Sequence, residues 1–448
     1  MTIDRRKFLA RALSTGALTT VAGGRLAQGA PSAPPAPPPQ PAAKPGPDLS
    51  TWPGVRAEFA LSRDYIHMAL MLLASHPRQV RDAIERHRRG LDDNPVTYGL
   101  SNFQKQEDAV RAAAADYAGG KPEEIALTGN TTTGLALLYG GLPLRPRQEI
   151  VASTHDHFAA YESLRLRALH TGATVRKIPL YALPEKATAD EIVGNLVKGI
   201  GPRTRAVAVT WVHSSTGVKL PIRRMADALA DVNKKRGDAD RVLLCVDGVH
   251  GFGVEQESFA DLGCDFFVAG CHKWIFGPRG TGLVWGRPDA WKGHQGIIPT
   301  FEWAGFKLWM QGKTPESLPP GPRVSPGGFQ AFEHRWALAE AFRFHLAIGK
   351  PRVTARIHEL ATRCKQGLAA IGGKVKLRTP MAADLSCGIT CFEIDGLPPK
   401  AIVEKLLAKK VVASDSPYAT SYARLTPGLL NTPEEVDRAV AEVKLLAA

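Results

Sequence analysis

Long hydrophobic runs, clustered cysteines and an extreme composition are all missing from this chain of 448 residues. No segment approaches the ~20 apolar residues that a membrane-spanning helix needs, so we expect no stable membrane span. Six cysteines are too few for a disulfide-stapled scaffold. Hydrophobic residues make up 44% and charged residues 22%, which excludes a wholly disordered chain, a collagen-like fibre and a coiled coil. At ~100–200 residues per domain, the length predicts two or three domains.

The formal net charge of +14 raises the question of a nucleic-acid partner. The densest cationic clusters are Arg86–Arg89 and Lys234–Arg236, and neither has the interleaved aromatic residues that stack on bases. Both lie near the ends of helical-looking stretches, where cations suit the helix dipole. Zinc-finger, helix-turn-helix and RNA-binding patterns are also lacking. We interpret the clusters as solvated faces and expect no nucleic-acid partner.

Part of the positive charge lies in the first 29 residues, which hold four arginines and a lysine against one acid. A weakly apolar run, from Leu9 to Gly24, and then small residues follow, which is the order of an export signal. The run Asp4–Leu9 resembles a twin-arginine signal. The alternative is a disordered basic leader. We expect residues 1–29 to be a signal peptide read by the twin-arginine export machinery, and the mature protein to be periplasmic or secreted.

Proline dominates the next segment, residues 30–48. Such a tract cannot form a helix or a central strand, because proline lacks the backbone N–H and its ring clashes with the preceding turn. The segment therefore predicts an extended spacer between the signal and the folded part.

From about residue 120 the chain alternates short β-branched runs with helical stretches. Several of the runs are apolar on both faces, as buried strands of a parallel sheet must be. The pattern predicts an α/β domain with a mainly parallel sheet and helices on both of its faces. The predicted strands are Glu124–Thr128, Ile150–Ser153, Thr174–Ile178, Ala206–Trp211, Val242–Asp247, Asp265–Ala269 and Gly282–Trp285.

The pattern changes past residue 320. A long helix over Phe332–Ile348 is followed by a second helix, by an alternating strand over Cys387–Ile394, and by a final amphipathic helix that Thr432 and Glu435 begin as a capping box. We therefore predict a large domain over residues 76–320 and a smaller α+β domain over residues 321–448. Residues 49–75 are expected to pack beside the smaller one.

Two ionisable side chains at the ends of predicted strands are candidates for a catalytic or cofactor-binding role. Asp247 closes one buried strand, and Lys273 lies just past the next. Carboxyl ends of neighbouring parallel strands converge on the crevice where ligands bind. The pair could be a buried ion pair, or it could serve pyridoxal phosphate. In the second case the amine forms a Schiff base with the aldehyde and the carboxylate keeps the pyridine nitrogen protonated.

The surrounding motif favours the second interpretation. Asp247 and His250 form Asp-x-x-His, and 26 residues after Asp247 comes Lys273 within His-Lys-Trp-x-Phe-Gly-Pro-x-Gly-x-Gly. With this motif, residues 60–445 resemble the fold-type I pyridoxal-phosphate enzymes of aminotransferase class V. Within them the chain is similar to the isopenicillin N epimerase-like branch, which is related to the cysteine desulfurases. The resemblance implies a seven-stranded, mainly parallel sheet in the large domain, pyridoxal 5'-phosphate as cofactor, a small amino-acid substrate and a homodimer.

The resemblance also implies roles for individual residues around the phosphate and the ring. Thr131 and Thr132 follow a strand and open a helix, whose free N–H groups bind phosphate. His157 matches the histidine that stacks on the pyridine ring, although His155 is two residues away and is the alternative. A metal site on these two histidines lacks a third ligand in the sequence, so we expect none.

Further residues match the family pattern one by one. Ser214 stands where relatives often have an asparagine near the ring hydroxyl, and His250 is expected beside the same hydroxyl. His272, next to the Schiff-base lysine, is expected to donate to the phosphate. Arg424 matches the arginine that grips the substrate carboxylate. Asn94 lies in a segment that resembles a loop near the site.

The match to the cysteine desulfurases breaks at their nucleophile. No cysteine occurs after Cys391, so the loop before Arg424 has none. We therefore disfavour desulfuration through a persulfide. The sequence predicts an exported enzyme acting at Cα of an amino acid or amino-acid derivative by epimerisation, transamination or elimination. The alternative is a catalytically idle binding or sensor protein on the same fold.

Overall fold

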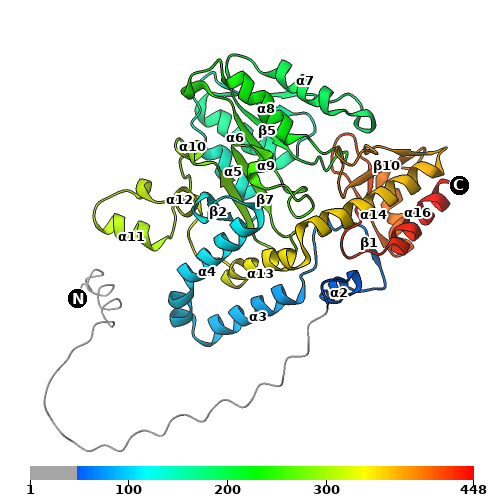
Figure 1. The fold of residues 1–448 in the computed structure, drawn as a ribbon, viewed down its shortest axis with the longest axis horizontal. Coiled ribbons are helices and arrows are strands. Elements are labelled where there is room, and N and C mark those ends of the chain that lie inside the picture. The colour runs from blue at the N-terminus through cyan, green and yellow to red at the C-terminus, as the bar shows by residue number, and fades with distance from the viewer. Residues whose placement is uncertain (1–47) are drawn as a thin grey trace, which may run out of the picture. The chain divides into compact units, whose positions relative to one another are not determined.

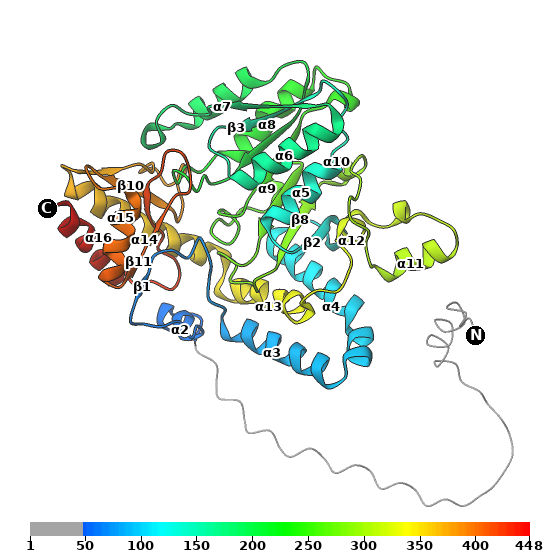
Figure 2. The same ribbon diagram turned by 180° about the vertical axis from the view of Figure 1, so that it is seen from behind.

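The computed structural model describes residues 48–448. The expected signal peptide and nearly all of the proline-rich spacer lie outside the described residues. The described part forms one compact unit, which Figures 1 and 2 show from opposite sides. No helix in this part is long and apolar enough to cross a membrane.

The central sheet has seven strands in the order β2-β8-β7-β6-β5-β3-β4. Pairings from β4 through β7 are parallel, and β8 runs antiparallel to both neighbours. The predicted α/β fold with a mainly parallel seven-stranded sheet is thereby confirmed. Its strands, each within two residues of its predicted range, are β2 (Ile125–Thr128), β3 (Glu149–Ser153), β4 (Thr174–Ile178), β5 (Thr204–Thr210), β6 (Leu243–Asp247), β7 (Phe266–Gly270) and β8 (Gly282–Gly286).

Helices cover both faces of this sheet, which is why its central strands are apolar on both sides. In β5, Ala206 and Ala208 pack into one core, while Val207 and Val209 pack into the other. The helices before residue 325 are α2 (Trp52–Ala57), α3 (Arg78–Asp93), α4 (Pro95–Ala118), α5 (Thr131–Gly141), α6 (Phe158–Thr171), α7 (Ala189–Gly199), α8 (Ile222–Asn233), α9 (Phe259–Leu262), α10 (Pro288–Trp291), α11 (Trp303–Met310) and α12 (Pro320–Val324). Helices α5 and α6 lie on the alanine side and α7 and α8 on the valine side. Figures 1 and 2 both show α11 on a segment that projects from the rest of the fold.

A second, four-stranded sheet lies toward the C-terminus in the order β12-β13-β10-β9 and is antiparallel throughout. Two-residue β1 pairs in parallel with β11, which ties the segment before α3 to this region. The elements are β1 (Ile66–His67), α13 (Phe332–Ile348), α14 (Lys350–Ile371), β9 (Val375–Leu377), β10 (Thr390–Ile394), α15 (Pro399–Ala408), β11 (Val411–Val412), β12 (Ser414–Asp415), β13 (Ala423–Leu425) and α16 (Pro433–Ala447).

Two local predictions can be compared directly with these elements. The capping box of α16 is confirmed, since Thr432 accepts from the N–H of Glu435 and the Glu435 side chain accepts from the N–H of Thr432. The predicted strand over Cys387–Ile394 is wrong in its first part, because β10 begins at Thr390. The physical reason is that Ser386 forms an isolated bridge with Val218 and directs this stretch toward the central-sheet region.

Candidate active site

The carboxyl ends of β5, β6 and β7 border a cavity of about 230 Å³. Parallel strands end at the same edge of the sheet, so Thr210, Asp247 and the turn after Gly270 meet there. Of the residues predicted from the sequence, those that line the cavity are Thr131, Thr132, His157, Ser214, Asp247, His250, His272 and Lys273.

One end of the cavity is built to hold an anion. Helix α5 begins at Thr131, so the N–H groups of its first turn point out of the helix. The hydroxyl of Thr131 accepts a hydrogen bond of 2.9 Å from the N–H of Gly270 and keeps its own hydrogen for a ligand. Gly270 is required there, because a Cβ would lie 2.8 Å from that hydroxyl. Buried Nδ1 of His272 has no hydrogen-bond partner, which leaves this atom free for a bound group.

Asp247 and Lys273 share the cavity without pairing directly. Nζ of Lys273 lies 3.5 Å from Nε2 of His250, and no ion pair joins the amine to Asp247 among residues 48–448. Burial lowers the pKa of Lys273 to about 8, an effect that Asp247 opposes and Arg424 reinforces. Burial likewise raises the pKa of Asp247 to about 6. The sequence left a buried ion pair open, and this arrangement favours a ligand-binding role instead.

The structure separates the two histidines that the sequence could not. His157 lines the cavity and caps α6, where its Nδ1 accepts from the N–H of Ala159 at 3.2 Å. His155 is stacked on the ring of Tyr181, with centroids 4.2 Å apart and planes 9° apart. Burial, followed by the charge of Lys273, lowers the pKa of His157, so its ring is neutral. His157 is therefore the residue available to face a bound ring.

Asp156 fixes the turn that carries His157. This carboxylate is 1% exposed and accepts hydrogen bonds of 2.8 Å from the N–H groups of Ser153 and Thr210. Burial raises the pKa of Asp156 to about 7. Two strand ends are thus tied together behind the cavity, which keeps His157 in place.

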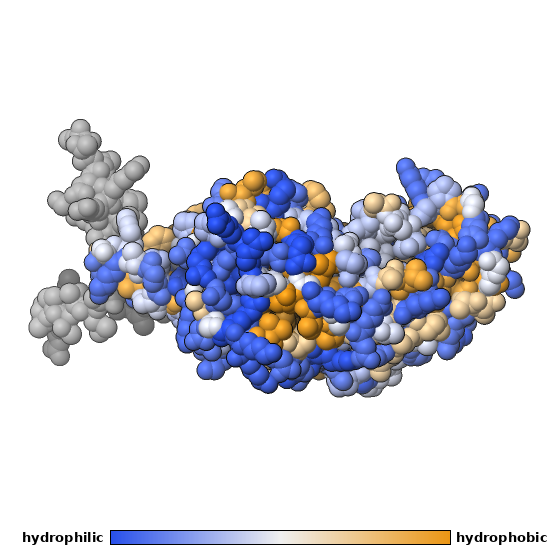
Figure 3. All heavy atoms as spheres, turned by 90° about the horizontal axis from the view of Figure 1, so that it is seen from above, coloured by the Kyte–Doolittle hydropathy of each residue, from blue (hydrophilic) through white to orange (hydrophobic). Residues whose placement is uncertain are grey.

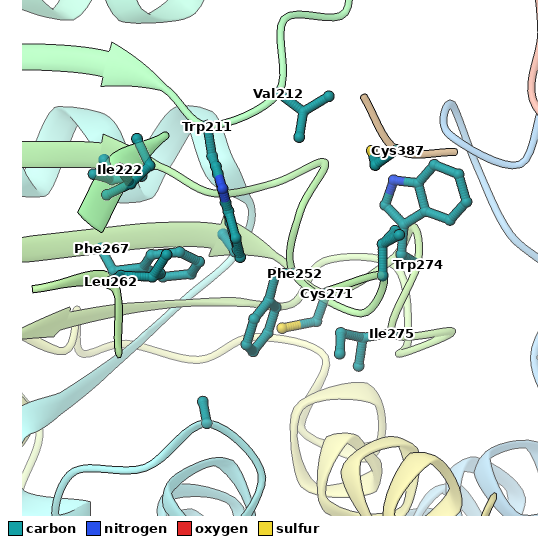
Figure 4. Close-up of a cluster of buried hydrophobic side chains, with 14 of the residues drawn as sticks. Trp211, Val212, Ile222, Phe252, Leu262, Phe267, Cys271, Trp274, Ile275 and Cys387 are labelled. Carbon is teal, nitrogen blue, oxygen red and sulfur yellow. The ribbon is translucent and has the colours of Figure 1, made fainter. Parts of the chain in front are cut away.

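Trp274 selects the tautomer of His250. The indole N–H donates to Nδ1 of His250 at 3.5 Å, so the neutral imidazole carries its proton on Nε2. This N–H faces Lys273 and can donate to its amine when the amine is neutral. Burial lowers the pKa of His250 well below its ordinary value and keeps the ring neutral. Figure 4 shows Trp274 beside Cys387 and Ile275 in the core that supports this wall. In the same view Trp211 faces Phe267, with ring centroids 6.2 Å apart.

Arg424 reaches the cavity region from β13. It is 1% exposed and donates through Nε to Ser414, through one terminal nitrogen to the carbonyl of Ser214 at 2.8 Å, and through the other to the carbonyl of Asp415. A guanidinium has five N–H groups. One hydrogen on each terminal nitrogen therefore stays uncommitted, which is the fork that binds a carboxylate at two points.

Two predicted site residues do not line the cavity: Arg424, which contacts the lining residue Ser214, and Asn94, which lies apart from it. Asn94 is exposed where α3 ends, and its side chain accepts from the N–H of Thr97 as the N-cap of α4.

Tyr418 lies beside the cavity although the sequence did not indicate it. Its hydroxyl lies 2.7 Å from the hydroxyl of Ser214, because the loop between β12 and β13 crosses toward the cavity. The only sequence signal was its position six residues before Arg424.

A metal centre finds no support at this site or elsewhere among residues 48–448. No group of three or more His, Cys, Asp or Glu side chains there could hold a metal ion.

Comparison with known proteins gives consistent results. A curated isopenicillin N epimerase of Streptomyces clavuligerus is 26% identical over 409 residues, which cover 87% of this chain and 97% of that protein. A probable cysteine desulfurase of Pseudomonas aeruginosa is 26% identical over 367 residues, which cover 79% of this chain and 83% of that protein.

Solved structures agree on the fold. The cystine C-S lyase C-DES in complex with its product cysteine persulfide has a TM-score of 0.78 and 21% identity, with 88% of this chain and 99% of that chain covered. The cysteine desulfurase CsdA of Escherichia coli has a TM-score of 0.73 and 20% identity, with 88% and 98% covered. The predicted fold, that of the fold-type I pyridoxal-phosphate enzymes, is confirmed.

The family model described as aminotransferase class-V matches residues 74–437. This family is pyridoxal-phosphate-dependent, which confirms the predicted cofactor. Because the match spans well over half of the sequence, the chain belongs to the aminotransferase class-V family.

Proposed function

We propose that this protein is a pyridoxal-phosphate enzyme that acts at Cα of an amino acid or a small amino-acid derivative. One observation carries the proposal. Lys273 and Asp247 line a single cavity without pairing to each other, and buried Arg424, whose charge acts on Lys273, keeps two donors free. Two buried cations and a lone carboxylate are costly in an apoprotein. A cofactor phosphate and a substrate carboxylate would neutralise them.

The residues fit the cofactor at each of its polar groups. Thr131, Thr132 and His272 would hold the phosphate, since they offer a helix N-terminus, hydroxyls and the unpartnered Nδ1. Asp247 would hold the pyridine nitrogen, and Lys273 would bind the aldehyde carbon covalently. When bound, the cofactor supplies an electron sink for the charge that develops at Cα.

The chain's own groups would then handle substrate and proton. Arg424 binds the α-carboxylate, which fixes Cα relative to Lys273. With its pKa lowered to about 8, Lys273 spends a useful fraction of time as a neutral amine near neutral pH, so it can take a proton from Cα and return it. His157 would face the ring and, because burial lowers its pKa, would add no positive charge to the site.

Epimerisation, transamination and elimination are all open to this set of groups. Desulfuration through a persulfide is disfavoured, because all six cysteines are buried and none lines the cavity. Burial also raises the pKa of Cys387 to about 12, so this thiol stays protonated and is a poor nucleophile.

A homodimer and export belong to the same proposal. Dimerisation is supported by large apolar side chains that this chain leaves exposed: Val96, Leu100, Trp309 and Phe329, at 69%, 73%, 73% and 89%. Figure 3 shows apolar surface gathered in the middle of one face. Asn94, which lies close in sequence to Val96, would then be placed to approach the partner's site. Export is supported by the basic leader with its Arg5-Arg6 pair.

The test has two arms. Borohydride reduction of the purified holoenzyme should fix the cofactor on the peptide that contains Lys273, and a Lys273→Met variant should carry none. Lys365 is the internal control, because it is also buried but is held by Pro380, Met381 and Ser386. A screen of L- and D-amino acids for α-hydrogen exchange in deuterium oxide, with product identification, then assigns the reaction. No cofactor binding after reconstitution, or no exchange with any amino acid, would contradict the proposal.

A further inference from the structure

Tyr418 is an ionisable side chain beside the cavity to which the proposed function gives no task. Its hydroxyl lies 2.7 Å from the hydroxyl of Ser214, which lines the cavity. Its ring packs edge-on against His157, with centroids 6.3 Å apart. Tyr418 thus contacts two groups of the cavity wall, although it belongs to the β12–β13 loop.

Hydrogen bonds between Ser416 and Tyr422 join the two sides of the loop that carries Tyr418. Ser416 organises it: the Ser416 N–H donates to the carbonyl of Tyr422 at 2.9 Å, and its hydroxyl accepts from the Tyr422 N–H at 2.9 Å. The Ser416 carbonyl also accepts from the N–H of Tyr418. These bonds hold the backbone on both sides of the phenol, so its position is set by the loop.

Ser214 joins Tyr418 to the substrate-binding arginine. Its hydroxyl pairs with Tyr418, and its carbonyl accepts from Arg424 at 2.8 Å. A substrate carboxylate gripped by Arg424 would therefore bring Cα close to the phenol. The charge of Arg424 also favours the phenolate that forms after a proton is given away, although burial, the larger effect, raises the pKa of Tyr418 to about 12. In the resting state the phenol is protonated.

Lys273 and Tyr418 approach from different parts of the fold. Lys273 follows β7 of the central sheet and lies against His250, whereas Tyr418 comes from the small sheet and lies against His157. No hydrogen bond or ion pair within residues 48–448 joins the two side chains. One proton-carrying group, Lys273, therefore lines the cavity, and a second, Tyr418, contacts its wall from another element, an arrangement that inversion by two separate groups can use.

We propose that Tyr418 donates a proton to Cα on the side opposite Lys273, so that the enzyme inverts the configuration of an amino acid. This proposal rests on the function proposed above and selects epimerisation among its outcomes. The Cα–H bond breaks and its proton passes to Nζ of Lys273, while the electron pair stays on carbon. That pair then takes the phenol proton as a new C–H bond. Tyr418, which is only partly buried, regains a proton from water, and Lys273 loses one to water.

The experiment compares Tyr418→Phe with Tyr422→Phe in the reconstituted enzyme. Tyr422 is a matched control, because it lies on the same loop but its ring faces Arg378 and not the cavity. Each variant is incubated with each enantiomer of the amino acid found by the exchange screen. Loss of the α-hydrogen signal is followed by NMR in deuterium oxide, and inversion by chiral chromatography. Cofactor affinity is measured separately by titrating the apoprotein.

We expect Tyr418→Phe to slow inversion by about 10²- to 10⁴-fold, the usual contribution of a general acid. Exchange of the enantiomer that Lys273 deprotonates should continue with retention of configuration, and cofactor affinity should change less than about threefold. Ser214→Ala, which removes the partner of the phenol, should reduce inversion by a smaller factor, about tenfold. Tyr422→Phe should match the wild type in every measurement.

Three results would overturn the assignment of Tyr418. Inversion at the wild-type rate in Tyr418→Phe would show that another group delivers the proton. An equal loss of exchange and inversion would show that Tyr418 only positions the site. Wild-type enzyme that exchanges the α-hydrogen but forms no second enantiomer would contradict inversion while leaving the proposed Cα chemistry intact. The proposed function itself fails if the wild type binds no cofactor or exchanges the α-hydrogen of no amino acid.

Discussion

Asp247→Asn should stabilise the apoprotein while it weakens cofactor binding. Burial raises the pKa of Asp247 from an ordinary value of 3.8 to about 6. A shift of about 2.2 units corresponds to about 3 kcal/mol of unfavourable free energy for the buried carboxylate at neutral pH. Asparagine has nearly the same shape and can still accept from the N–H of Val249, but it carries no charge. Removing the charge should therefore remove most of that cost.

The pH dependence of this effect has a definite sign. Because the folded-state pKa is the higher one, the stability that Asp247 contributes is complete below pH 3.8 and is lost as the pH rises through about 6. The difference between Asp247→Asn and wild type should thus be near zero at pH 4 and reach its plateau above pH 7. With an unfolding entropy of ~2.1 cal/mol/K per residue over the described chain, 3 kcal/mol corresponds to about 4 °C in melting temperature.

The assay is thermal unfolding of both apoproteins at one fixed protein concentration, from pH 4 to pH 8. Asp265→Asn is the control, because that carboxylate is also buried but is paired with Arg241 at 2.7 Å and with Arg287. It should lower the melting temperature, since its removal leaves two cations unpaired. A lower melting temperature for Asp247→Asn at neutral pH, or a gain that persists unchanged at pH 4, would refute the reasoning. Cofactor affinity should fall by about 10- to 150-fold, the value of one charged hydrogen bond.

Four further predictions follow from other contacts. Cofactor uptake by the apoprotein should accelerate as the pH rises through about 8, because only the neutral Lys273 amine attacks the aldehyde; a rate independent of pH between 6 and 9 would contradict this. Arg424→Lys should raise the KM for the amino acid by about 10- to 100-fold with little change in cofactor affinity, since an ammonium cannot keep the three existing bonds and also bind a carboxylate at two points. Arg378→Lys is the control, because Arg378 pairs with Glu185 and Glu393 and does not line the cavity. Gly248→Ala should destabilise the fold by about 1–3 kcal/mol in chemical denaturation, because its Cβ would lie 1.9 Å from the ring of Phe267. Gly194→Ala, with no atom within 4 Å of its Cβ in α7, should instead stabilise by about 0.5–1 kcal/mol.

Regular elements with strong patterns were predictable from the sequence to within a residue or two. Helix α13 occupies the predicted range Phe332–Ile348, because its apolar residues recur at helical spacing and Gly349 ends it. Strand β6 ends at Asp247 as expected, since a run that is apolar on both faces fits only a covered strand. These elements are specified by residues that lie close together in the sequence, which is why they could be predicted from it.

Features that depend on pairing between distant segments were not predictable in the same way. The strand expected from Cys387 begins at Thr390, because Ser386 pairs with Val218. The sequence favours His157 over His155 without deciding between them, and the stacking of His155 on Tyr181 assigns them to different places. Tyr418 could not be predicted for the same reason, because its hydrogen-bond partner Ser214 is 204 residues away in the sequence. The site's core motif is local, whereas the groups that steer its chemistry come from long-range contacts.

The net charge of the chain does not identify a binding partner, whereas the charged groups around the cavity indicate which ligand groups it would bind. Part of the overall +14 belongs to the first 29 residues, and the rest is scattered along the sequence; salt and water screen such charges where they are exposed. Lys273 and Asp247 line the cavity, and buried Arg424 is near enough for its charge to act on Lys273. Burial is the main cause of the lowered pKa of Lys273; Asp247 opposes it and the charge of Arg424 adds to it. Binding of one phosphate and one α-carboxylate would supply the missing anions. The substrate's carboxylate would also weaken the effect of Arg424 on Lys273, so the basicity of Lys273 should rise when substrate arrives. Lys273 would then become the stronger base needed to remove the Cα proton only in the complex with substrate.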